Sequence, residues 1–150
     1  MTTTFQAIVL NPGECRAPVL VLDEPLSFWG GFDPVHGTVV DSHHPQRGAC
    51  LAGKVLVMPG SRGSAGTPAG IAEAIRRGAG PVAVLLGTVD VNITIGAMVA
   101  DRLYGGATAV LTVGAEDYGR LRTGDEVTVG LDGVVTIGAA GPPTIVHLVD

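Results

Sequence analysis

The sequence is poor in several features that would point to common partners. Nine lysine and arginine residues stand against fourteen acidic ones, which leaves a formal net charge of −5. A chain with this balance lacks the basic surface with which proteins bind nucleic acids or anionic membranes. No run approaches the roughly 18 apolar residues of a membrane helix, and residues 1–4 begin no pattern of a basic stretch followed by an apolar one. We therefore predict a cytoplasmic protein with neither nucleic-acid nor membrane partners.

Metal-ligating residues are also scarce. Cys15 and Cys50 are the only cysteines, and their spacing is not that of a metal-ligand pair; it neither supports nor excludes a disulfide, so packing is their expected role. His43 and His44 are adjacent, and adjacent side chains of an extended chain point to opposite sides, which makes them poor ligands for one ion. The sequence thus predicts no metal site in this chain, and a loop histidine hydrogen-bonded to the backbone instead.

What the chain has in quantity is apolar residues, which make up 46% of its 150 positions. This is enough for a substantial core, and we assign residues 1–150 to a single domain. In the middle of the chain, short apolar runs of strand type alternate with helical patterns. The expected strands are 55–58, 82–86 and 109–113, and the expected helices begin near residue 67 and within 89–104. This alternation favours parallel pairing of the strands.

The two ends of the chain are richer in strands. Strands are expected at 5–10, 18–22 and 38–41, and residues 125–129 with 131–137 have the pattern of a tight hairpin. Residues 144–149 could add an edge strand. The fold class predicted is therefore α/β with β-rich ends, not a plain dinucleotide-binding unit.

Apolar side chains also group on the expected helices and in one loop. The only tryptophan, Trp29, follows Phe28 and precedes two glycines. The first interpretation of this segment is a hydrophobic plug over the core; the alternative is a surface that docks on a partner, where aromatic residues are favoured. On the helices, the residues that share one face are Ile71, Ala74 and Ile75 in the first and Ile95, Met98, Val99 and Leu103 in the second.

The most informative stretch is the glycine-rich loop 59–68, between the strand 55–58 and the first helix. Thr67 suits the N-cap of that helix and Pro68 its first position. A loop between a strand end and a helix N-terminus presents unpaired N–H groups, which favour an anion.

Three side chains of this loop add chemistry to its backbone. Arg62 supplies a fixed positive charge, and Ser61 and Ser64 supply hydroxyls. Gly63 is one of three glycines that let the backbone approach a ligand. The glycine spacing matches neither the dinucleotide motif nor a phosphate-binding P-loop, which needs a lysine. A carboxylate or phosphate pocket and an ordinary surface loop of turn residues both remain open at this point.

Several segments together resemble the small subunit, or swivel domain, of the aconitase X family. The likeness covers nearly the whole chain in a consistent order. The matching segments are 23–31, Asp33-Pro34, Asp41 with His44-Pro45, 53–57, the loop 62–64, Gly96-Ala97, Val99-Ala100 and 103–105. The resemblance implies a swivelling β/β/α fold of aconitase type, with a mixed sheet and helices packed against it.

The resemblance also implies a function. Members are two-part hydro-lyases that dehydrate cis-3-hydroxy-L-proline in bacteria or phosphomevalonate in archaea. An iron or iron–sulfur centre belongs to a separate large subunit, which agrees with the lack of a cysteine cluster here. The swivel domain is taken to deliver a serine base, and the matching position is Ser64, with Ser61, Arg62 and Gly63 as substrate-binding neighbours. The family's loop often continues with further serines, whereas this chain has Ala65 and Gly66.

This chemistry is coherent with the residues. Dehydration of a hydroxy acid needs a base at one carbon and a Lewis acid on the departing hydroxyl. A serine alkoxide must be stabilised by nearby charge, for which Arg62 and the helix N-terminus are available. Two other classes are compatible with the sequence: a stand-alone binding or regulatory module for a small carboxylate or phosphate, and a phosphohistidine-carrying swivel domain. The latter is disfavoured because neither His43 nor His44 lies in a glycine-rich loop that starts a helix.

Overall fold

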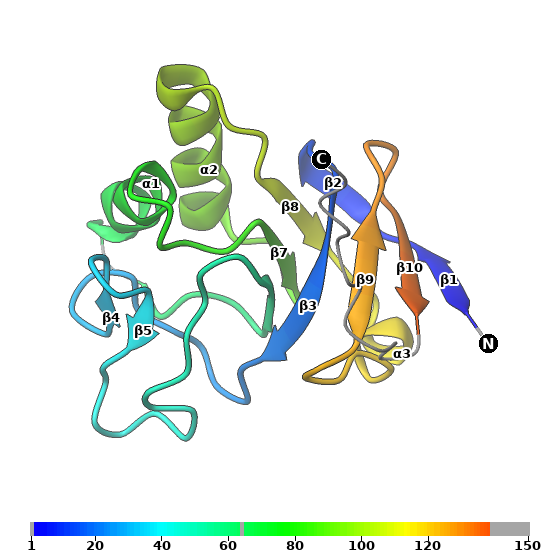
Figure 1. Cartoon of the computed structure of the whole chain (residues 1–150), viewed down its shortest axis with the longest axis horizontal. Helices are drawn as coiled ribbons and strands as arrows, with labels where there is room; N and C mark the ends of the chain where they lie inside the picture. Colours follow the sequence, from blue (N-terminus) through cyan, green and yellow to red (C-terminus); the bar gives the residue numbers. More distant parts are fainter. Residues whose placement is uncertain (1, 64, 139–150) are drawn as a thin grey trace, which may run out of the picture.

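One mixed sheet of eight strands organises the residues that the computed structural model describes, 2–63 and 65–138 (Figure 1). In sheet order the strands are β1 (Thr3–Gln6), β10 (Val134–Gly138), β9 (Glu126–Val129), β3 (Cys15–Val21), β6 (Val55–Met58), β7 (Ala83–Leu86), β8 (Ala109–Thr112) and β2 (Ile8–Asn11). A separate antiparallel pair consists of β4 (Phe32–Asp33) and β5 (Thr38–Val39).

The sheet has a parallel half and an antiparallel half. Strands β3, β6, β7 and β8 pair in parallel, which confirms the prediction for the middle of the chain. Strands β9 and β10 form the predicted hairpin, and β1 and β3 flank it in antiparallel pairing. Strand β3 therefore joins the two halves, because it pairs with β9 along its first residues and with β6 along its last.

The first strand of the sequence prediction is divided in two. We expected one strand over 5–10, but the chain pairs with β10 before Ala7 and with β8 after it. Ala7 itself is buried and donates its amide hydrogen to the carbonyl of Gly133 at 2.9 Å. Since β1 and β2 are the two edges of the sheet, one short stretch of chain holds both edges, and the sheet must curl.

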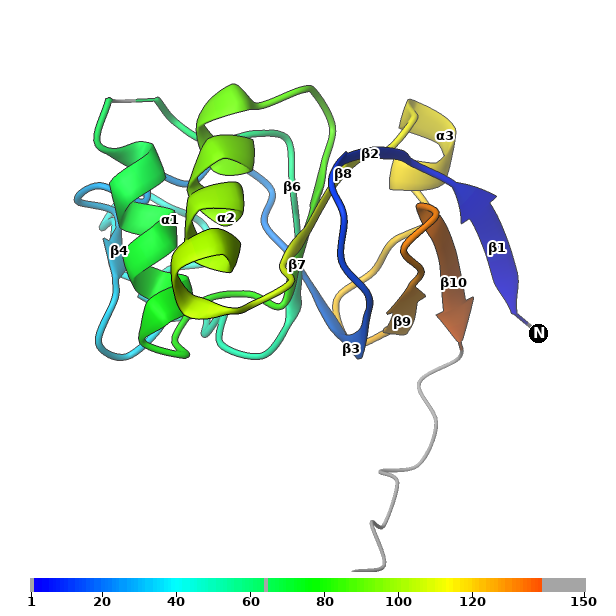
Figure 2. The same ribbon diagram turned by 90° about the horizontal axis from the view of Figure 1, so that it is seen from above.

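Curling produces three layers, seen from above in Figure 2. Strands β1, β10 and β9 form one layer, the parallel strands the middle layer, and α1 (Thr67–Arg76) and α2 (Val91–Tyr104) the third. A short helix, α3 (Ala115–Tyr118), follows β8. Alternate residues of the middle strands enter different cores: Val55 and Val57 face the antiparallel layer, whereas Leu56 and Met58 face the helices. This is the expected β/β/α architecture.

The first helix begins one residue earlier than the capping pattern suggested. Gly66 is its N-cap, Thr67 is its first helical residue, and Pro68 occupies the second position. The predicted N-cap at Thr67 is therefore wrong; Thr67 is fully buried instead. Ile71 and Ala74 face the core as expected.

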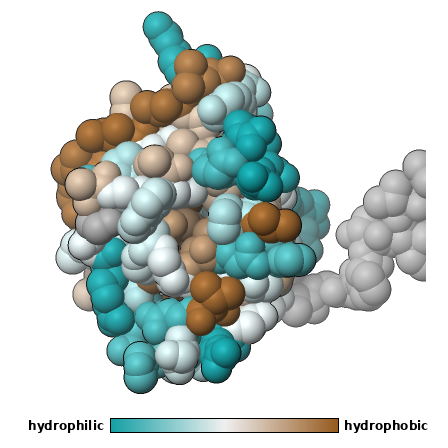
Figure 3. Space-filling view, turned by 90° about the vertical axis from the view of Figure 1, so that its left-hand side faces the viewer, coloured by the Kyte–Doolittle hydropathy of each residue, from teal (hydrophilic) through white to brown (hydrophobic). Residues whose placement is uncertain are grey.

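The second helix turns its largest apolar side chains outward. Small residues form its buried side together with Ile93, and a Cβ at Gly96 would come within 2.0 Å of the Ile71 Cγ2 atom. The two helices thus approach too closely for a larger side chain at that crossing. The predicted apolar face of Ile95, Met98, Val99 and Leu103 is between 42% and 66% exposed. Figure 3 shows the molecule from the side on which the helices lie, with hydrophobic surface along its upper edge.

The plug interpretation of the segment around Trp29 is confirmed for Phe28 but not for Trp29, which is 64% exposed. Phe28 takes that role: it is buried and its ring centroid lies 5.1 Å from that of Phe32. The two neighbouring rings thus differ in burial, and residues 28–30 form a turn.

Three further expectations concern the cysteines, the membrane and the last strand. Cys15 and Cys50 are both unpaired thiols and half-buried. No helix in the described ranges has the length and apolar character to cross a membrane. The expected edge strand at 144–149 lies outside the described residues.

Candidate active site

The loop 59–68 leaves the carboxyl end of β6, at the edge of the sheet where β7 and β8 also end. The segment after β7 runs alongside it: Gly87 donates to the carbonyl of Met58 and Thr88 to that of Pro59, both at 3.2 Å. Loops at the carboxyl ends of parallel strands are the usual location of ligand sites in α/β sheets. The sequence-predicted loop therefore lies where a site is expected.

Asp90 fixes the start of this loop. One carboxylate oxygen, Oδ2, accepts hydrogen bonds from the Ser61 amide at 2.7 Å and from the Ser61 hydroxyl at 2.6 Å. The other, Oδ1, accepts from the Ile93 amide at 3.1 Å and so caps α2. A single side chain thus ties the loop to the next helix. Our sequence reasoning missed Asp90, although an aspartate just before a helical pattern is a recognised N-cap signal.

Arg62 is placed beside two carboxylates that the sequence did not pair with it. Its NH2 group lies 3.9 Å from Glu24 Oε1 and its NH1 group 3.8 Å from Asp41 Oδ2. Its side chain is 53% exposed, so these are loose ion pairs of small net worth. More than half of the side chain is open to solvent, and the N–H groups of a guanidinium suit a two-pronged contact with a carboxylate or phosphate.

The position of Glu24 is fixed by His44. The His44 ring is buried; its Nδ1 accepts from the Gln46 amide at 3.0 Å, so its Nε2 carries the hydrogen and donates to the Glu24 carbonyl at 3.0 Å. His44 is thus the backbone-bonded loop histidine that the sequence predicted. His43 lies on the surface.

The remaining loop residues differ in their surroundings. A Cβ placed on Gly63 would meet nothing within 4 Å, so the backbone there is open to a ligand. A Cβ on Gly66 would lie 2.7 Å from the ring of Trp29. Ser64, the predicted base, lies outside the described residues. The structure therefore brings Ser61, Arg62 and Gly63 to one edge together with Asp90, Glu24 and Asp41.

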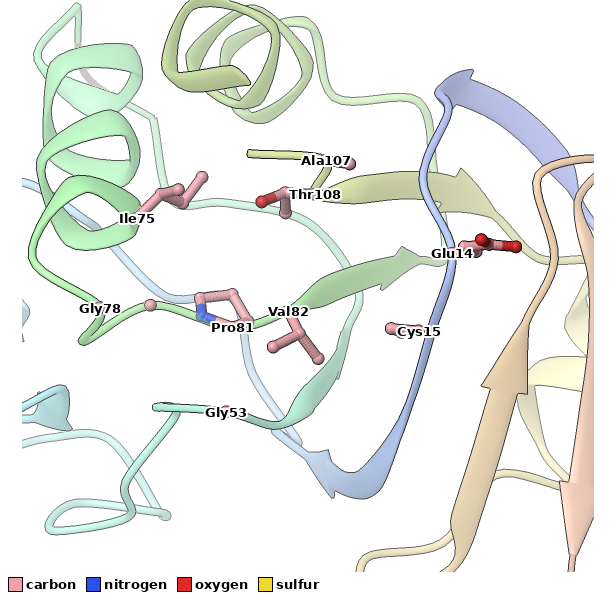
Figure 4. A pocket seen from close by; sticks show the side chains of 10 residues that line it. Glu14, Cys15, Gly53, Ile75, Gly78, Pro81, Val82, Ala107 and Thr108 are labelled. Carbon is pink, nitrogen blue, oxygen red and sulfur yellow. The ribbon is translucent and has the colours of Figure 1, made fainter. Parts of the chain in front are cut away.

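Two hollows outside the loop do not suit a small anion. The first, of about 430 Å³, lies at the amino ends of β6, β7 and β8, and Glu14 is the only charged residue among the described ones that line it (Figure 4). The second, of about 360 Å³, lies between Trp29 and α1 and has Glu73 at its rim. Hydrogen bonds from Arg76 and Arg77 lower the pKa of Glu73 to about 2, so this carboxylate is ionised and already paired with two arginines.

The described residues contain no group of three or more histidine, cysteine, aspartate or glutamate side chains placed to hold a metal ion. An iron centre has no set of donors in this part of the chain.

Known proteins resemble this chain in sequence and in fold. Residues 4–137 match the aconitase X swivel domain. The chain is 38% identical over 105 residues to the cis-3-hydroxy-L-proline dehydratase of Pseudomonas aeruginosa, covering 70% of this chain and 18% of that protein. It is 40% identical over 92 residues to the phosphomevalonate dehydratase small subunit of Methanothermobacter thermautotrophicus, covering 61% of this chain and 70% of that subunit.

The fold agrees with a solved structure. The crystal structure of Thermococcus kodakaraensis aconitase X in its holo-form superposes with a TM-score of 0.78 at 30% identity, over 91% of this chain and 98% of that one. The chain spans about a fifth of the length of the two cis-3-hydroxy-L-proline dehydratases that it matches. By its sequence over residues 4–137 and by its three-layered fold, the chain belongs to the aconitase X swivel-domain family.

Proposed function

We propose that this chain is the small subunit of a two-subunit hydro-lyase that removes water from a small hydroxy acid. The candidate substrates are cis-3-hydroxy-L-proline and phosphomevalonate, which are named in the relatives. Both carry an anionic group. The observation that carries the proposal is the likeness to dehydratase small subunits over most of their length, combined with an arginine-bearing loop at the carboxyl edge of the parallel strands.

In this proposal Ser64 is the base. It follows Arg62 and Gly63 in the loop and precedes the N-terminus of α1 by three positions. A serine hydroxyl is a weak base, so its alkoxide needs the positive charge of Arg62 and the partial positive charge of the helix N-terminus. The same charges are suited to hold the anionic group of the substrate.

The neighbours of Ser64 divide into two roles. We propose that Arg62 and Gly63 contact the substrate. The Arg62 side chain is about half exposed, and a Cβ on Gly63 would meet open space. We also predicted substrate contact for Ser61, but its hydroxyl donates to Asp90. This hydrogen bond favours a role for Ser61 in holding the loop.

The iron centre is proposed to reside in a large subunit, where it would act as Lewis acid on the departing hydroxyl. The large subunit is proposed to cover the loop and the neighbouring segment that contains Trp29, whose exposed ring suits the centre of an interface. Mixing the purified subunits and measuring their mass by light scattering tests this arrangement. Separate subunits at micromolar concentration would contradict it.

The decisive test of the reaction is Ser64→Ala in the reconstituted complex. Loss of a positioned base lowers turnover by about a hundredfold to ten-thousandfold. Folding and assembly should persist, because a loop hydroxyl contributes little to a core. Ser42→Ala, at an exposed serine of a different segment, is the matched control and should leave turnover unchanged. A Ser64→Ala complex that retains more than about a third of turnover has not lost its base.

The chain alone should be inactive with either substrate. Binding of substrate by the chain alone, with no activity in the mixture, would support the stand-alone binding module instead. The assignment of residues 1–150 to one swivel domain and the cytoplasmic location remain proposals based on the sequence.

A further inference from the structure

One segment of the chain, 24–29, runs alongside the loop and contacts it at both ends. At the near end, Leu26 forms a parallel bridge with Ser61, and its carbonyl accepts a hydrogen bond from the Arg62 amide at 3.0 Å. At the far end, the Trp29 ring lies against Gly66. The part of the loop between these two contacts is residues 63–65.

The far contact depends on the absence of a side chain at Gly66. A Cβ there would lie 2.7 Å from Cγ and Cδ2 of Trp29 and 3.1 Å from its Cε3, and real Cβ atoms essentially never come within 3.0 Å of another atom. The backbone itself does not require glycine, because φ is −81° and ψ is −10°. At an N-cap, serine, threonine, asparagine or aspartate would serve the helix at least as well as glycine. The ring of Trp29 therefore explains why this position has no side chain.

The backbone of Trp29 is fixed by its neighbours, although most of the residue is exposed. The Ser27 hydroxyl donates to the Trp29 carbonyl at 2.8 Å and closes a tight turn. The preceding residue, Phe28, is buried, and a Cβ on Gly70 would come within 2.4 Å of its carbonyl oxygen. Gly66 and Gly70 are one helical turn apart, so a single glycine face of α1 receives the backbone of Phe28 and the ring of Trp29.

We propose that Trp29 is a positioning residue whose ring, seated on Gly66, sets the far end of the loop 61–66. The inference rests on the proposed function for its effect on turnover. Its physical basis does not, because the contact exists within this chain. Because the ring leaves no room for a Cβ on Gly66, it limits where the backbone of residues 65 and 66 can lie. Small displacements of a reacting group cost about a hundredfold in rate.

Gly63 offers a matched control for Gly66. Both lie in the same loop and neither has a positive φ, but a Cβ on Gly63 meets open space. Trp29 is the only tryptophan of the chain, so its emission reports on this contact directly. In the purified chain, Gly66→Ala should raise the rate at which acrylamide quenches Trp29, because the added methyl group displaces the ring. Gly63→Ala should leave the quenching rate at its wild-type value.

The effect on turnover is tested by a double-mutant cycle in the reconstituted complex. Gly66→Ala should lower kcat by about tenfold to a hundredfold and change KM by less than about twofold, because the displaced group is the base. With Trp29→Ala already present, Gly66→Ala should cost less than about a further twofold, because the methyl group then has room. Trp29→Phe keeps a flat ring and should retain most of the turnover that Trp29→Ala loses. Circular dichroism confirms that each variant is folded.

The outcomes separate this inference from the proposed function. The positioning role would be overturned if Gly66→Ala lowered kcat equally in the wild-type and Trp29→Ala backgrounds. It would also be overturned if Gly66→Ala left the quenching rate unchanged. Both conclusions would hold even if Ser64→Ala abolished turnover. A change in quenching with full turnover in Gly66→Ala would overturn it as well. If Ser64→Ala keeps its turnover while the cycle still shows strong coupling, the proposed base is wrong and the positioning of the loop by Trp29 stands.

Discussion

The two ends of the loop 61–66 are held by different kinds of interaction. At the start, Asp90 and Leu26 hold Ser61 and Arg62 through hydrogen bonds with defined directions. At the end, the Trp29 ring and the Phe28 backbone hold Gly66 and Gly70 by close packing on glycines. The hydrogen-bonded end depends on polar groups being present, whereas the packed end depends on side chains being absent. The substitutions that damage the two ends should therefore be opposite in kind: removal of atoms at the first and addition of atoms at the second.

The largest effect is expected from Asp90→Ala at the hydrogen-bonded end. Loss of the N-cap of α2 should lower the free energy of unfolding by about 1 kcal/mol. The Ser61 amide, left without its partner, should lower it by about a further 1–3 kcal/mol. A total near 3 kcal/mol lowers the thermal midpoint of a chain of this size by roughly 10 °C. Asp90→Asn is the matched variant: it keeps a good capping oxygen and should lose the contact to the Ser61 amide, whereas its NH2 group can donate to the Ser61 hydroxyl. If the thermal midpoint falls no further in Asp90→Ala than in Asp90→Asn, the N-cap of α2 contributes nothing to stability.

The packed end should respond next most strongly, to Gly70→Ala. An alanine inside a helix ordinarily stabilises it by about 1 kcal/mol relative to glycine. Here the new Cβ would lie 2.4 Å from the Phe28 carbonyl oxygen, a backbone atom that cannot move alone. We expect a net loss of about 2 kcal/mol in the free energy of unfolding, measured with denaturant. A gain in stability would show that the segment 28–29 is not packed on α1 as described.

Arg62→Lys tests what the hydrogen-bonded end presents to the substrate. Lysine keeps the positive charge but loses the planar pair of donors that matches a carboxylate or phosphate. KM of the reconstituted complex should rise by roughly tenfold, equivalent to about 1.4 kcal/mol, with kcat less affected. A fall in kcat at constant KM would instead assign Arg62 to stabilisation of the serine alkoxide.

The smallest effect is expected from Ser61→Ala. The hydroxyl contact to Asp90 is lost, but the amide contact to the same oxygen remains. One hydrogen bond to a charged carboxylate is worth about 1.5–3 kcal/mol of stability. Turnover of the complex should fall by less than about tenfold, since the backbone of the loop keeps its anchor. A loss as large as that of Ser64→Ala would mean that Ser61 contacts the reacting groups.

Local patterns in the sequence determined the elements and their pairing in the middle of the chain. The runs 55–58, 82–86 and 109–113 were found as strands because each is apolar on both faces, and both faces proved to be buried in different cores. The hairpin of β9 and β10 was likewise found from adjacent segments. The loop was found because Arg62 and its neighbouring glycines lie together in the sequence. The likeness to the swivel domain rested on the same local motifs.

Only the tertiary structure decided what surrounds that loop. Asp90 is 29 residues from Ser61, and Trp29 is farther still from Gly66, so no local pattern predicts either contact. Periodicity likewise identified the apolar side of α2 but not that it faces outward, because Gly96 and its small neighbours allow α1 to pack against the opposite side. Nor could it show that the strand 5–10 divides at Ala7 between two partners. Sequence periodicity shows which side of an element is apolar. The surface against which that side packs depends on the positions of segments that are distant in the sequence.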